Sequence, residues 1–329
     1  MMSTNYNVFI CHRGPDTKHN IVSVLEGMLR SNGITCFVDY RMDEGNDVNV
    51  SIRNAIDISL VHIVILSPTF NTSSWCLDEA LRIIEIQKTS SSSNKPRKVI
   101  PVFYDVDSST VREIPILKRS TPQNMNDWGE ALEGLLNLKG FKYQSKSAFE
   151  WEELDKIVSD VKDFLMSRDI IPSNCDEREN TWKMHLRPDY GSVFICHKGD
   201  DTQRNVVSVF RGILRSRGIT CLIVDYKREE THRKLDIHNA IRNSRVHVIF
   251  LSKSFVTSKQ CLDEIVEIMN ESSFESPSKV KVLPVFCDVA PYMVRHQSEC
   301  STYDLQNMKG STDEERKRWA KALYEIYRI

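Results

Sequence analysis

The stretch Val8-Phe-Ile-Cys-His-Arg-Gly-Pro-Asp-Thr17 opens with a short apolar run and recurs 185 residues later as Val193-Phe-Ile-Cys-His-Lys-Gly-Asp-Asp-Thr202. Around it, the 30 positions of Asn7–Cys36 match those of Ser192–Cys221 at 20 identical residues. This predicts one duplicated domain, because solenoid repeats recur at roughly 20–45 residues. A chain of 329 residues also exceeds what a single hydrophobic core commonly organises.

Later matches set the limits of the two copies. Cys76-Leu-Asp-Glu79 recurs as Cys261-Leu-Asp-Glu264, and Trp128 aligns with Trp319. On this alignment the second copy has no counterpart of residues 139–168. We therefore predict a complete first domain at residues 1–168 and a polar linker at 169–188. A second domain follows at 189–329 and lacks the last strand and the last helix.

The first copy alternates apolar runs with amphipathic segments. We expect strands at residues 7–11, 35–38, 60–66 and 99–104, and helices at 21–32, 48–58 and 74–87. A last helix carries apolar residues at helical spacing, namely Leu154, Ile157, Val158, Val161 and Leu165. Such alternation predicts an α/β fold with a doubly wound parallel sheet, whose ligand sites lie beyond the carboxyl ends of the strands.

Charge and composition exclude several classes of function. A net charge of −1, from 44 Lys and Arg against 45 Asp and Glu, gives no general attraction to nucleic acid or to a membrane surface. The N-terminus lacks the features of a secretory signal, and no apolar run approaches the roughly 20 residues of a membrane-spanning helix. Nine cysteines without such a signal predict free thiols in the cytoplasm, with the nucleus left open as a second location. Their spacing does not suggest a metal site.

Three motifs of the first copy carry a resemblance to a known family. They are Tyr6-Asn-Val-Phe-Ile-Cys-His-Arg-Gly-Pro-Asp-Thr17, Ser73-Ser-Trp-Cys-Leu-Asp-Glu79 and Val99-Ile-Pro-Val-Phe-Tyr-Asp-Val106. In this order and spacing they resemble a plant TIR (Toll/interleukin-receptor) domain over about residues 6–168. The resemblance implies a flavodoxin-like sheet of five parallel strands. It also implies association with itself and with other TIR proteins, and cleavage of NAD+ at the nicotinamide–ribose bond.

By this resemblance, Glu79 is the catalytic carboxylate, and NAD+ is a substrate while no prosthetic group is expected. Cleavage develops positive charge on the ribose, which a nearby carboxylate stabilises. We expect Ser74 to cap the helix and to place Glu79 in the first turn, where the helix dipole favours the ionised form. Trp75 lies four residues before Glu79 and is expected to offer a stacking surface beside it. Without the resemblance, both residues would be ordinary helix and packing residues.

Further binding residues are expected in two loops. Arg13, Gly14 and Asp16 follow the first strand, where α/β folds place ligand contacts, and Arg13 is suited to a pyrophosphate. A surface arginine in a turn is the alternative. Residues 39–49 lie where this family keeps a loop that closes the pocket, and Gly45 supplies the flexibility. A solvated connection between elements is the alternative there.

His12 and His197 occupy equivalent places beside the strand ends. We expect hydrogen-bonded structural imidazoles, with a catalytic base as the less favoured alternative. The sequence contains no Walker loop and no HExxH motif, so it lacks the signatures of ATPases and metalloproteases.

The second copy keeps the acid but changes its surroundings. Lys198 stands at the position of Arg13 and loses the planar guanidinium, and Gln260 stands at the position of Trp75 and loses the aromatic face. We predict that the site around Glu264 is degenerate. We further predict that this copy docks on another TIR surface through the edge and apolar face that its missing elements leave exposed.

Two functions remain open at this point. The first is an NAD+-cleaving signalling enzyme of plant innate immunity, favoured by the pair Trp75 and Glu79. The second is a non-enzymatic TIR adaptor or decoy that acts through TIR–TIR association, favoured by the altered second copy. Plant members typically carry Ser-His in the first helix, whereas this chain has Ser23-Val24, so the expected self-association surface is altered.

Overall fold

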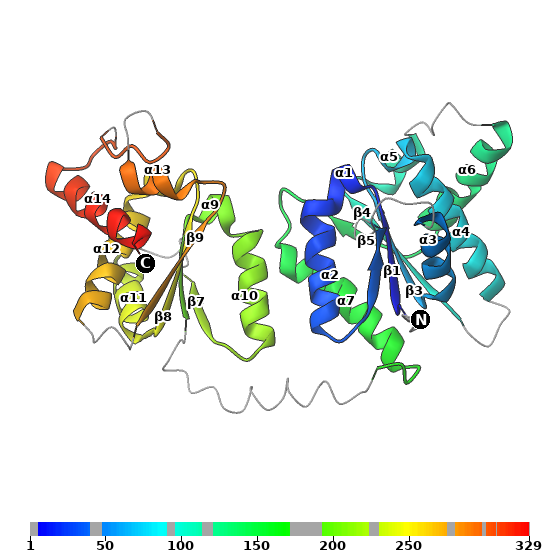
Figure 1. Ribbon diagram of the computed structural model, residues 1–329, viewed down its shortest axis with the longest axis horizontal. Helices are drawn as coiled ribbons and strands as arrows, with labels where there is room; N and C mark the ends of the chain where they lie inside the picture. The colour runs from blue at the N-terminus through cyan, green and yellow to red at the C-terminus, as the bar shows by residue number, and fades with distance from the viewer. Residues whose placement is uncertain are drawn as a thin grey trace. The chain divides into compact units, whose positions relative to one another are not determined.

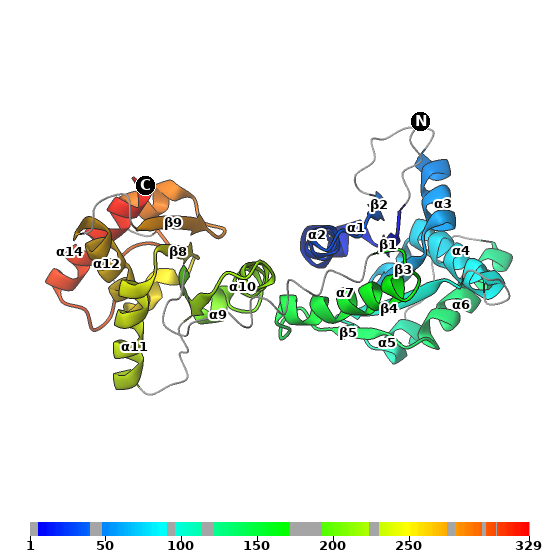
Figure 2. The ribbon, with the colours of Figure 1, turned by 90° about the horizontal axis from the view of Figure 1, so that it is seen from below.

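The computed structural model describes residues 6–39, 48–90, 96–113, 121–171, 193–223, 230–274, 280–297, 301–306 and 308–328. The chain divides into two compact units, Met1–Asn174 and Cys175–Ile329, and each has its own parallel sheet flanked by helices (Figure 1, Figure 2). The predicted duplicated α/β fold is therefore confirmed. Most of the predicted linker lies outside the described residues. Ile171 is buried in the first core, so the first unit extends beyond residue 168.

The first sheet has five parallel strands in the order β2-β1-β3-β4-β5. Their bounds are β1 (Val8–His12), β2 (Cys36–Val38), β3 (Val61–Leu66), β4 (Lys98–Tyr104) and β5 (Phe141–Tyr143). Every residue of β1 and β3 is buried, as expected of central parallel strands with helices on both faces. This is the flavodoxin-like order, in which the chain passes from β1 to one side and then to the other.

Helices cover both faces of this sheet (Figure 1). One face carries α2 (Ser23–Ser31) and α7 (Glu150–Met166). The short helix α1 (Gly14–Thr17) and the π-helix η1 (Lys18–Val22) lie between β1 and α2. The other face carries α3 (Val48–Ile58), the 3-10 turn η3 (Phe70–Thr72), α4 (Ser74–Ser90), α5 (Ser108–Glu113) and α6 (Pro122–Leu136). The predicted helices and strands are confirmed within a few residues, whereas α5 and α6 were not predicted.

The second sheet has four parallel strands in the order β7-β6-β8-β9. They are β6 (Val193–His197), β7 (Cys221–Ile223), β8 (Val246–Leu251) and β9 (Lys281–Phe286). The described helices are α9 (Gly199–Thr202), α10 (Val206–Ser216), α11 (Glu230–Asn243), the 3-10 turn η5 (Phe255–Thr257), α12 (Lys259–Phe274), α13 (Pro291–His296) and α14 (Asp313–Tyr327).

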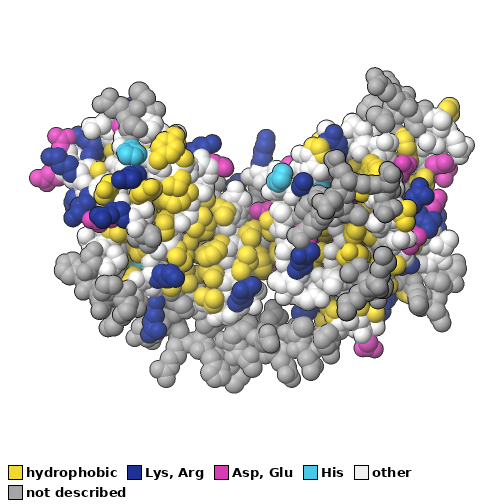
Figure 3. All heavy atoms as spheres, in the orientation of Figure 1, with side chains coloured by type: hydrophobic (Ala, Val, Ile, Leu, Met, Phe, Trp, Pro, Cys, Tyr) yellow, Lys and Arg dark blue, Asp and Glu magenta, His cyan; other side chains and the backbone are white. Residues whose placement is uncertain are grey.

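A hydrogen bond between a tryptophan and an aspartate, present in both units, identifies the last described helix of the second unit. In the first unit, the Trp128 indole of α6 donates to Asp78 of α4 over 2.8 Å. In the second unit, the Trp319 indole of α14 donates to Asp263 of α12 over 2.9 Å. Helix α14 therefore corresponds to α6, and no described residue of the second unit forms a counterpart of β5 or α7. Hydrophobic side chains gather at the surface over β9 and α10 (Figure 3).

A buried histidine connects β3 to α3 in the first unit. His62 is fully buried, and its Nε2 donates to the carbonyl of Ile56 over 2.8 Å. Its Nδ1 has no hydrogen-bond partner among the described residues. Burial lowers the pKa of His62 to about 4, because a proton on Nδ1 would place an unpartnered charge in the core. His247 donates in the same way to Ile241 in the second unit.

We predict that His62 lowers the stability of the first unit as the pH falls below 6.5, in opposition to Glu79, whose raised pKa has the reverse effect over the same range. Between pH 6.5 and about pH 4, His62 binds a proton in the unfolded state but not in the folded state, so protonation favours unfolding increasingly over this range. On going from pH 7 to pH 5, the opening free energy of His62→Gln should change by about 2 kcal/mol in the stabilising direction relative to that of the wild type. Hydrogen exchange of the β1 and β3 amides measures this free energy. His247→Gln is the matched control and should leave these amides unaffected; equal pH dependence in wild type and His62→Gln would contradict the prediction.

Candidate functional site

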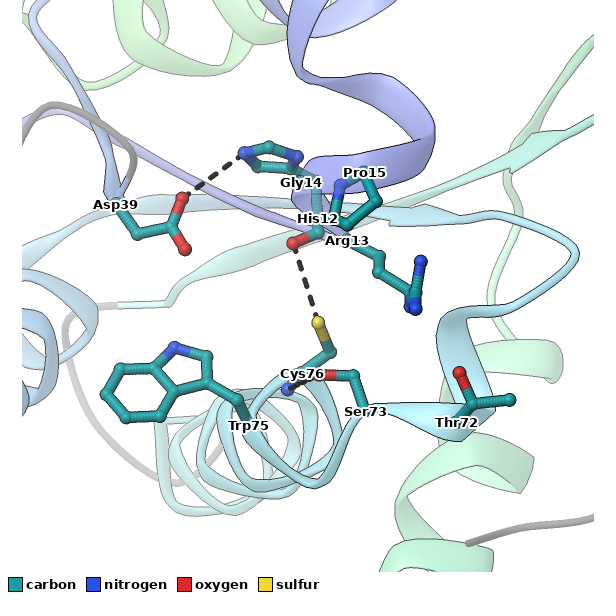
Figure 4. Close-up of a pocket in the computed structure, with 9 residues that line it drawn as sticks. All are labelled: His12, Arg13, Gly14, Pro15, Asp39, Thr72, Ser73, Trp75 and Cys76. Atoms are coloured by element: carbon teal, nitrogen blue, oxygen red, sulfur yellow. Dashed lines mark hydrogen bonds and ion pairs between the residues drawn. The ribbon is translucent and has the colours of Figure 1, made fainter.

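A cavity of about 390 Å³ lies at the carboxyl ends of β1, β2 and β3 in the first unit (Figure 4). This volume lies in the lower part of the range found for small-molecule sites, about 300–1,000 Å³. Three segments line the cavity, with the residues His12, Arg13, Gly14, Pro15, Asp39, Thr72, Ser73, Trp75 and Cys76. The position beside β1, where the strand order reverses, is where open α/β sheets bind ligands.

The predicted site residues do not all meet in this cavity. Arg13, Gly14 and Trp75 line it, whereas Glu79 and Asp16 do not. Figure 4 shows Arg13 and Trp75 on opposite sides of Cys76. Gly45 lies outside the described residues.

Glu79 lies one helical turn beyond Trp75 on α4, behind the cavity wall. The prediction that Ser74 caps this helix is wrong by one residue, since Ser73 accepts the Cys76 amide over 3.3 Å. Helix α4 begins at Ser74, so Glu79 is its sixth residue and lies in the second turn rather than the first.

The environment of Glu79 favours the protonated acid. Glu79 is only 6% exposed, and its Oε1 has no hydrogen-bond partner among the described residues. Burial raises the pKa of Glu79 to about 8; hydrogen bonding with the Cys11 thiol and the Trp75 indole opposes this rise, and the charge of Asp39 adds to it. The expectation that the helix dipole keeps Glu79 ionised is therefore wrong, because desolvation outweighs the dipole.

Trp75 and Glu79 lie on the same side of α4, as their spacing predicts. The Trp75 side chain is 39% exposed, which is unusual for a large apolar residue. An exposed indole on a cavity wall offers a face on which a planar ring can stack.

Asp16 holds two loops of the site together. Its carboxylate accepts hydrogen bonds from Ser67 Oγ over 2.5 Å, from Thr69 Oγ1 over 2.6 Å and from Arg13 Nη1 over 2.9 Å. Partial burial raises the pKa of Asp16, but these three partners outweigh it, so the pKa lies below its ordinary value. Asp16 thus fixes Arg13 at the cavity without itself lining it, and the substrate contact predicted for Asp16 stays a prediction.

The His12 ring is held by a hydrogen bond at its Nδ1 nitrogen. Thr17 donates its single hydroxyl proton to the Arg13 carbonyl over 3.0 Å, so its oxygen accepts from His12 Nδ1 over 2.9 Å. The other nitrogen, Nε2, lies 3.3 Å from Asp39 Oδ1, without the alignment of a good hydrogen bond (Figure 4). This arrangement fits the structural histidine that the sequence favours and positions Asp39 at the cavity.

Two cysteines lie at the floor of the cavity: Cys76 lines it and Cys11 lies beneath. The Cys76 thiol donates to the His12 carbonyl over 3.5 Å, and the Cys11 thiol donates to the Cys76 carbonyl over 3.8 Å. Burial raises the pKa of Cys76 to about 12 and also raises that of Cys11. Both therefore act as packing groups and not as nucleophiles.

Comparison with protein families identifies the fold. The family model described as "TIR domain" matches residues 5–181 and again residues 191–328. The chain belongs to the TIR domain family. Both matches together cover nearly the whole chain, in agreement with the duplicated sheet.

Curated relatives of these TIR domains occur in Arabidopsis thaliana. "Disease resistance-like protein DSC1" is 30% identical over 183 residues, which are 52% of this chain and 14% of that protein. "Disease resistance-like protein CSA1" is 27% identical over 309 residues, 86% of this chain and 25% of that protein. The chain thus spans a quarter or less of the length of these relatives. Among solved structures, the TIR domains of the activated Roq1 resistosome that recognises the pathogen effector XopQ show 28% identity and a TM-score of 0.39, over 47% of this chain and 99% of that one.

The second TIR unit repeats the supports of the site. Thr202 accepts from His197 Nδ1 over 3.2 Å, and the Cys261 thiol donates to the His197 carbonyl over 3.5 Å. Burial raises the pKa of Glu264 to about 7, and Gln260 donates to its carboxylate over 3.2 Å. The second unit therefore retains the buried acid, Glu264. At the position of Trp75, which is expected to stack on a ligand, it has Gln260, which donates a hydrogen bond to this acid.

Sequence reasoning missed five residues of the cavity: Pro15, Asp39, Thr72, Ser73 and Cys76. Asp39 opens the loop of residues 39–49 that the sequence places at the pocket, but it was not singled out there. Thr72, Ser73 and Cys76 reach the cavity through the turn that joins β3 to α4 and through the start of that helix. In the described part of the chain, no group of His, Cys, Asp and Glu residues is arranged to hold a metal ion, and no helix is long and apolar enough to cross a membrane.

We predict that Asp16→Ala lowers the free energy of unfolding of the first unit by about 1–3 kcal/mol, because it leaves three donors without an acceptor. Urea denaturation followed by hydrogen exchange of β1 and β3 measures the loss. Thr69→Ala removes only one of these bonds at an exposed position and should cost clearly less. If Asp16→Ala lowered the free energy of unfolding no more than Thr69→Ala does, the three hydrogen bonds of Asp16 would not stabilise the first unit together, and the prediction would be wrong.

Proposed function

We propose that the first TIR unit cleaves NAD+ at the nicotinamide–ribose bond and that Glu79 is the carboxylate that stabilises the transition state. The observation that carries this proposal is a buried carboxylate directly behind an exposed indole at a cavity with an adjacent guanidinium. These are the groups that a cationic ring, a ribose and a pyrophosphate require.

Each group has a distinct role in this proposal. The Trp75 face stacks against the nicotinamide ring, and Arg13, held by Asp16, binds the pyrophosphate through paired hydrogen bonds. Gly14 leaves open space beside its backbone, where a phosphate can approach closely. When the glycosidic bond breaks, positive charge moves onto the ribose, and an ionised Glu79 lowers the energy of that state.

The raised pKa of Glu79 fits a substrate that carries its own positive charge. The free site keeps Glu79 protonated at neutral pH, since its pKa is about 8. A bound nicotinamide cation beside it favours the carboxylate and thus lowers this pKa. The substrate thereby produces the charge that its cleavage needs. Because Glu79 lies behind the wall, the exposed Trp75 side chain must shift on binding to bring acid and ribose together.

The setting of this activity follows from the relatives. Their names place them among plant disease resistance proteins, and we propose that this chain signals in plant innate immunity through association with itself and with other TIR proteins. The described cysteines are free, in keeping with a reducing compartment, which we propose to be the cytoplasm and also the nucleus.

A second function is favoured by the other unit. Gln260 and Lys198 replace the groups assigned to stacking and to pyrophosphate binding, while the fold is kept. A chain whose two units both failed to cleave NAD+ would be a TIR adaptor or decoy that acts through its surfaces.

We predict that Glu79→Gln reduces nicotinamide release from NAD+ at least a hundredfold, because the uncharged amide cannot stabilise the ribose cation. Release is measured by chromatography on the purified full chain, with a crowding agent to promote association. Glu264→Gln is the matched control and should retain nearly full activity. Equal release by wild type and Glu79→Gln would reject Glu79 as the catalyst, and no release by any variant would favour the adaptor.

We predict that kcat/KM for NAD+ rises with pH up to about 8 and then levels, since it reports the ionisation of Glu79 in the free protein. The corresponding break in kcat should lie at lower pH, because the bound cation lowers the pKa of Glu79. Steady-state rates between pH 5.5 and pH 9.5 test both statements. A kcat/KM that does not change over this range would contradict the assignment.

A further inference from the structure

Among the described residues of the second unit, no helix covers the face of the sheet that α7 covers in the first unit. In the first unit, α7 packs on α2 and β4, and the apolar residues beneath it are buried. They are Ile21, Met28, Ile100, Val102 and Tyr104, with exposed fractions from 0% to 9%. Their burial depends on the apolar stripe of α7, formed by Leu154, Ile157, Val158, Val161 and Leu165.

The equivalent residues of the second unit reach the solvent. Val206 and Ile213 of α10 are 36% and 39% exposed, and Leu283 of β9 is 39% exposed. Val285 and Cys287 are only partly buried. Figure 3 shows these elements under a continuous hydrophobic area. We call these five residues the α10–β9 surface.

The shape of this surface suits one helix. Strand β9 begins Lys281-Val-Leu-Pro-Val-Phe286 and β4 begins Lys98-Val-Ile-Pro-Val-Phe103, so the two differ by one methyl position. The pairing of β9 with β8 repeats that of β4 with β3 residue by residue. The first unit therefore shows what such a strand and the helix beside it accommodate: an amphipathic helix of 17 residues.

Charges at the two ends of the surface define the polarity of that helix. In the first unit, Lys98 pairs with Asp160 in the C-terminal half of α7 over 2.6 Å. Lys281, its equivalent, is exposed and has no ion pair among the described residues, and exposed Arg245 replaces the apolar Leu60 nearby. Two cations thus lie where the negative end of a helix dipole would be placed.

The opposite end carries a carboxylate. Asp105 after β4 accepts from the Ser145 amide and hydroxyl over 2.7 and 2.6 Å, in the segment that leads into α7. Asp288 after β9 has the same left-handed backbone, with φ of 51° against 53° for Asp105. Asp288 thus occupies the place that, in the first unit, contacts the segment leading into α7, at the end of the surface opposite Lys281.

We propose that the α10–β9 surface binds an amphipathic helix of a protein partner, with acidic residues in the C-terminal half of that helix. The helix lies with its N-terminus toward Asp288 and its acidic end toward Lys281 and Arg245. Its apolar stripe covers Ile213 and Leu283 as α7 covers Met28 and Ile100. This is recognition of a helix by side-chain anchors at i, i+3, i+4 and i+7.

A synthetic peptide of residues 150–168 with a fluorescent label is the probe, because it has the required stripe and charges. Its anisotropy is measured against the unlabelled full chain. Leu283→Asp should weaken binding at least tenfold, because it places a charge at a contact that burial of leucine stabilises. Val50→Asp is the matched control: this valine is 58% exposed on α3 of the first unit, and its substitution should not change the affinity.

A charge exchange tests the polarity and does not depend on how Leu283→Asp folds. Lys281→Glu should weaken binding two- to fivefold, as expected of one exposed ion pair. A peptide with Asp160→Lys should bind Lys281→Glu better than wild type. No binding by wild type, or equal binding by wild type and Leu283→Asp, would overturn the proposal. Two further outcomes would overturn it. The first is a concentration-dependent dimer of the chain that Ile213→Asp abolishes and that the peptide does not displace. The second is binding of the surface to lipid vesicles and not to the peptide.

Discussion

Strands β1 and β3 are buried along their whole length, and neither has a face that tolerates water. This constraint requires a covering layer on both faces of the sheet, and the crossover connections between its parallel strands supply helices to both. The carboxyl ends of the strands then meet at one edge, and the chain leaves β1, β2 and β3 there. The cavity lies between the segments that follow these three strands, so its position follows from the burial of β1 and β3.

The duplication separates what the fold needs from what the site needs. Both units keep the histidine–threonine bond after the first strand, the cysteine that contacts the histidine carbonyl, and a buried glutamate with a raised pKa. These features belong to the scaffold, because they persist where Trp75 and Arg13 are replaced. A buried glutamate alone therefore does not indicate catalysis, and what distinguishes the first unit is the indole and the guanidinium beside its glutamate.

Much of the fold could be predicted because its signals are local. Continuous apolar runs and helical spacing identify most strands and helices, and the repeat identifies the duplication. The site depends on contacts between distant segments, which no local pattern contains. The pKa of Glu79 is raised by burial, and the thiol of Cys11, from β1 far away in the sequence, bonds with it; Asp16 is held by Ser67 and Thr69, which arrive from the end of β3 and the turn after it. The cap at Ser73 was missed because two adjacent serines are equivalent in sequence.

The sulfur atoms under the cavity have a practical consequence. Cys11 and Cys76 hold their protons tightly because a thiolate there would be a buried charge. Alkylating reagents and oxidants attack the thiolate, so these two side chains are shielded from them by protonation as well as by packing. Their modification therefore requires the sheet and α4 to separate, and the rate at which they are labelled records how often this edge of the protein opens in solution.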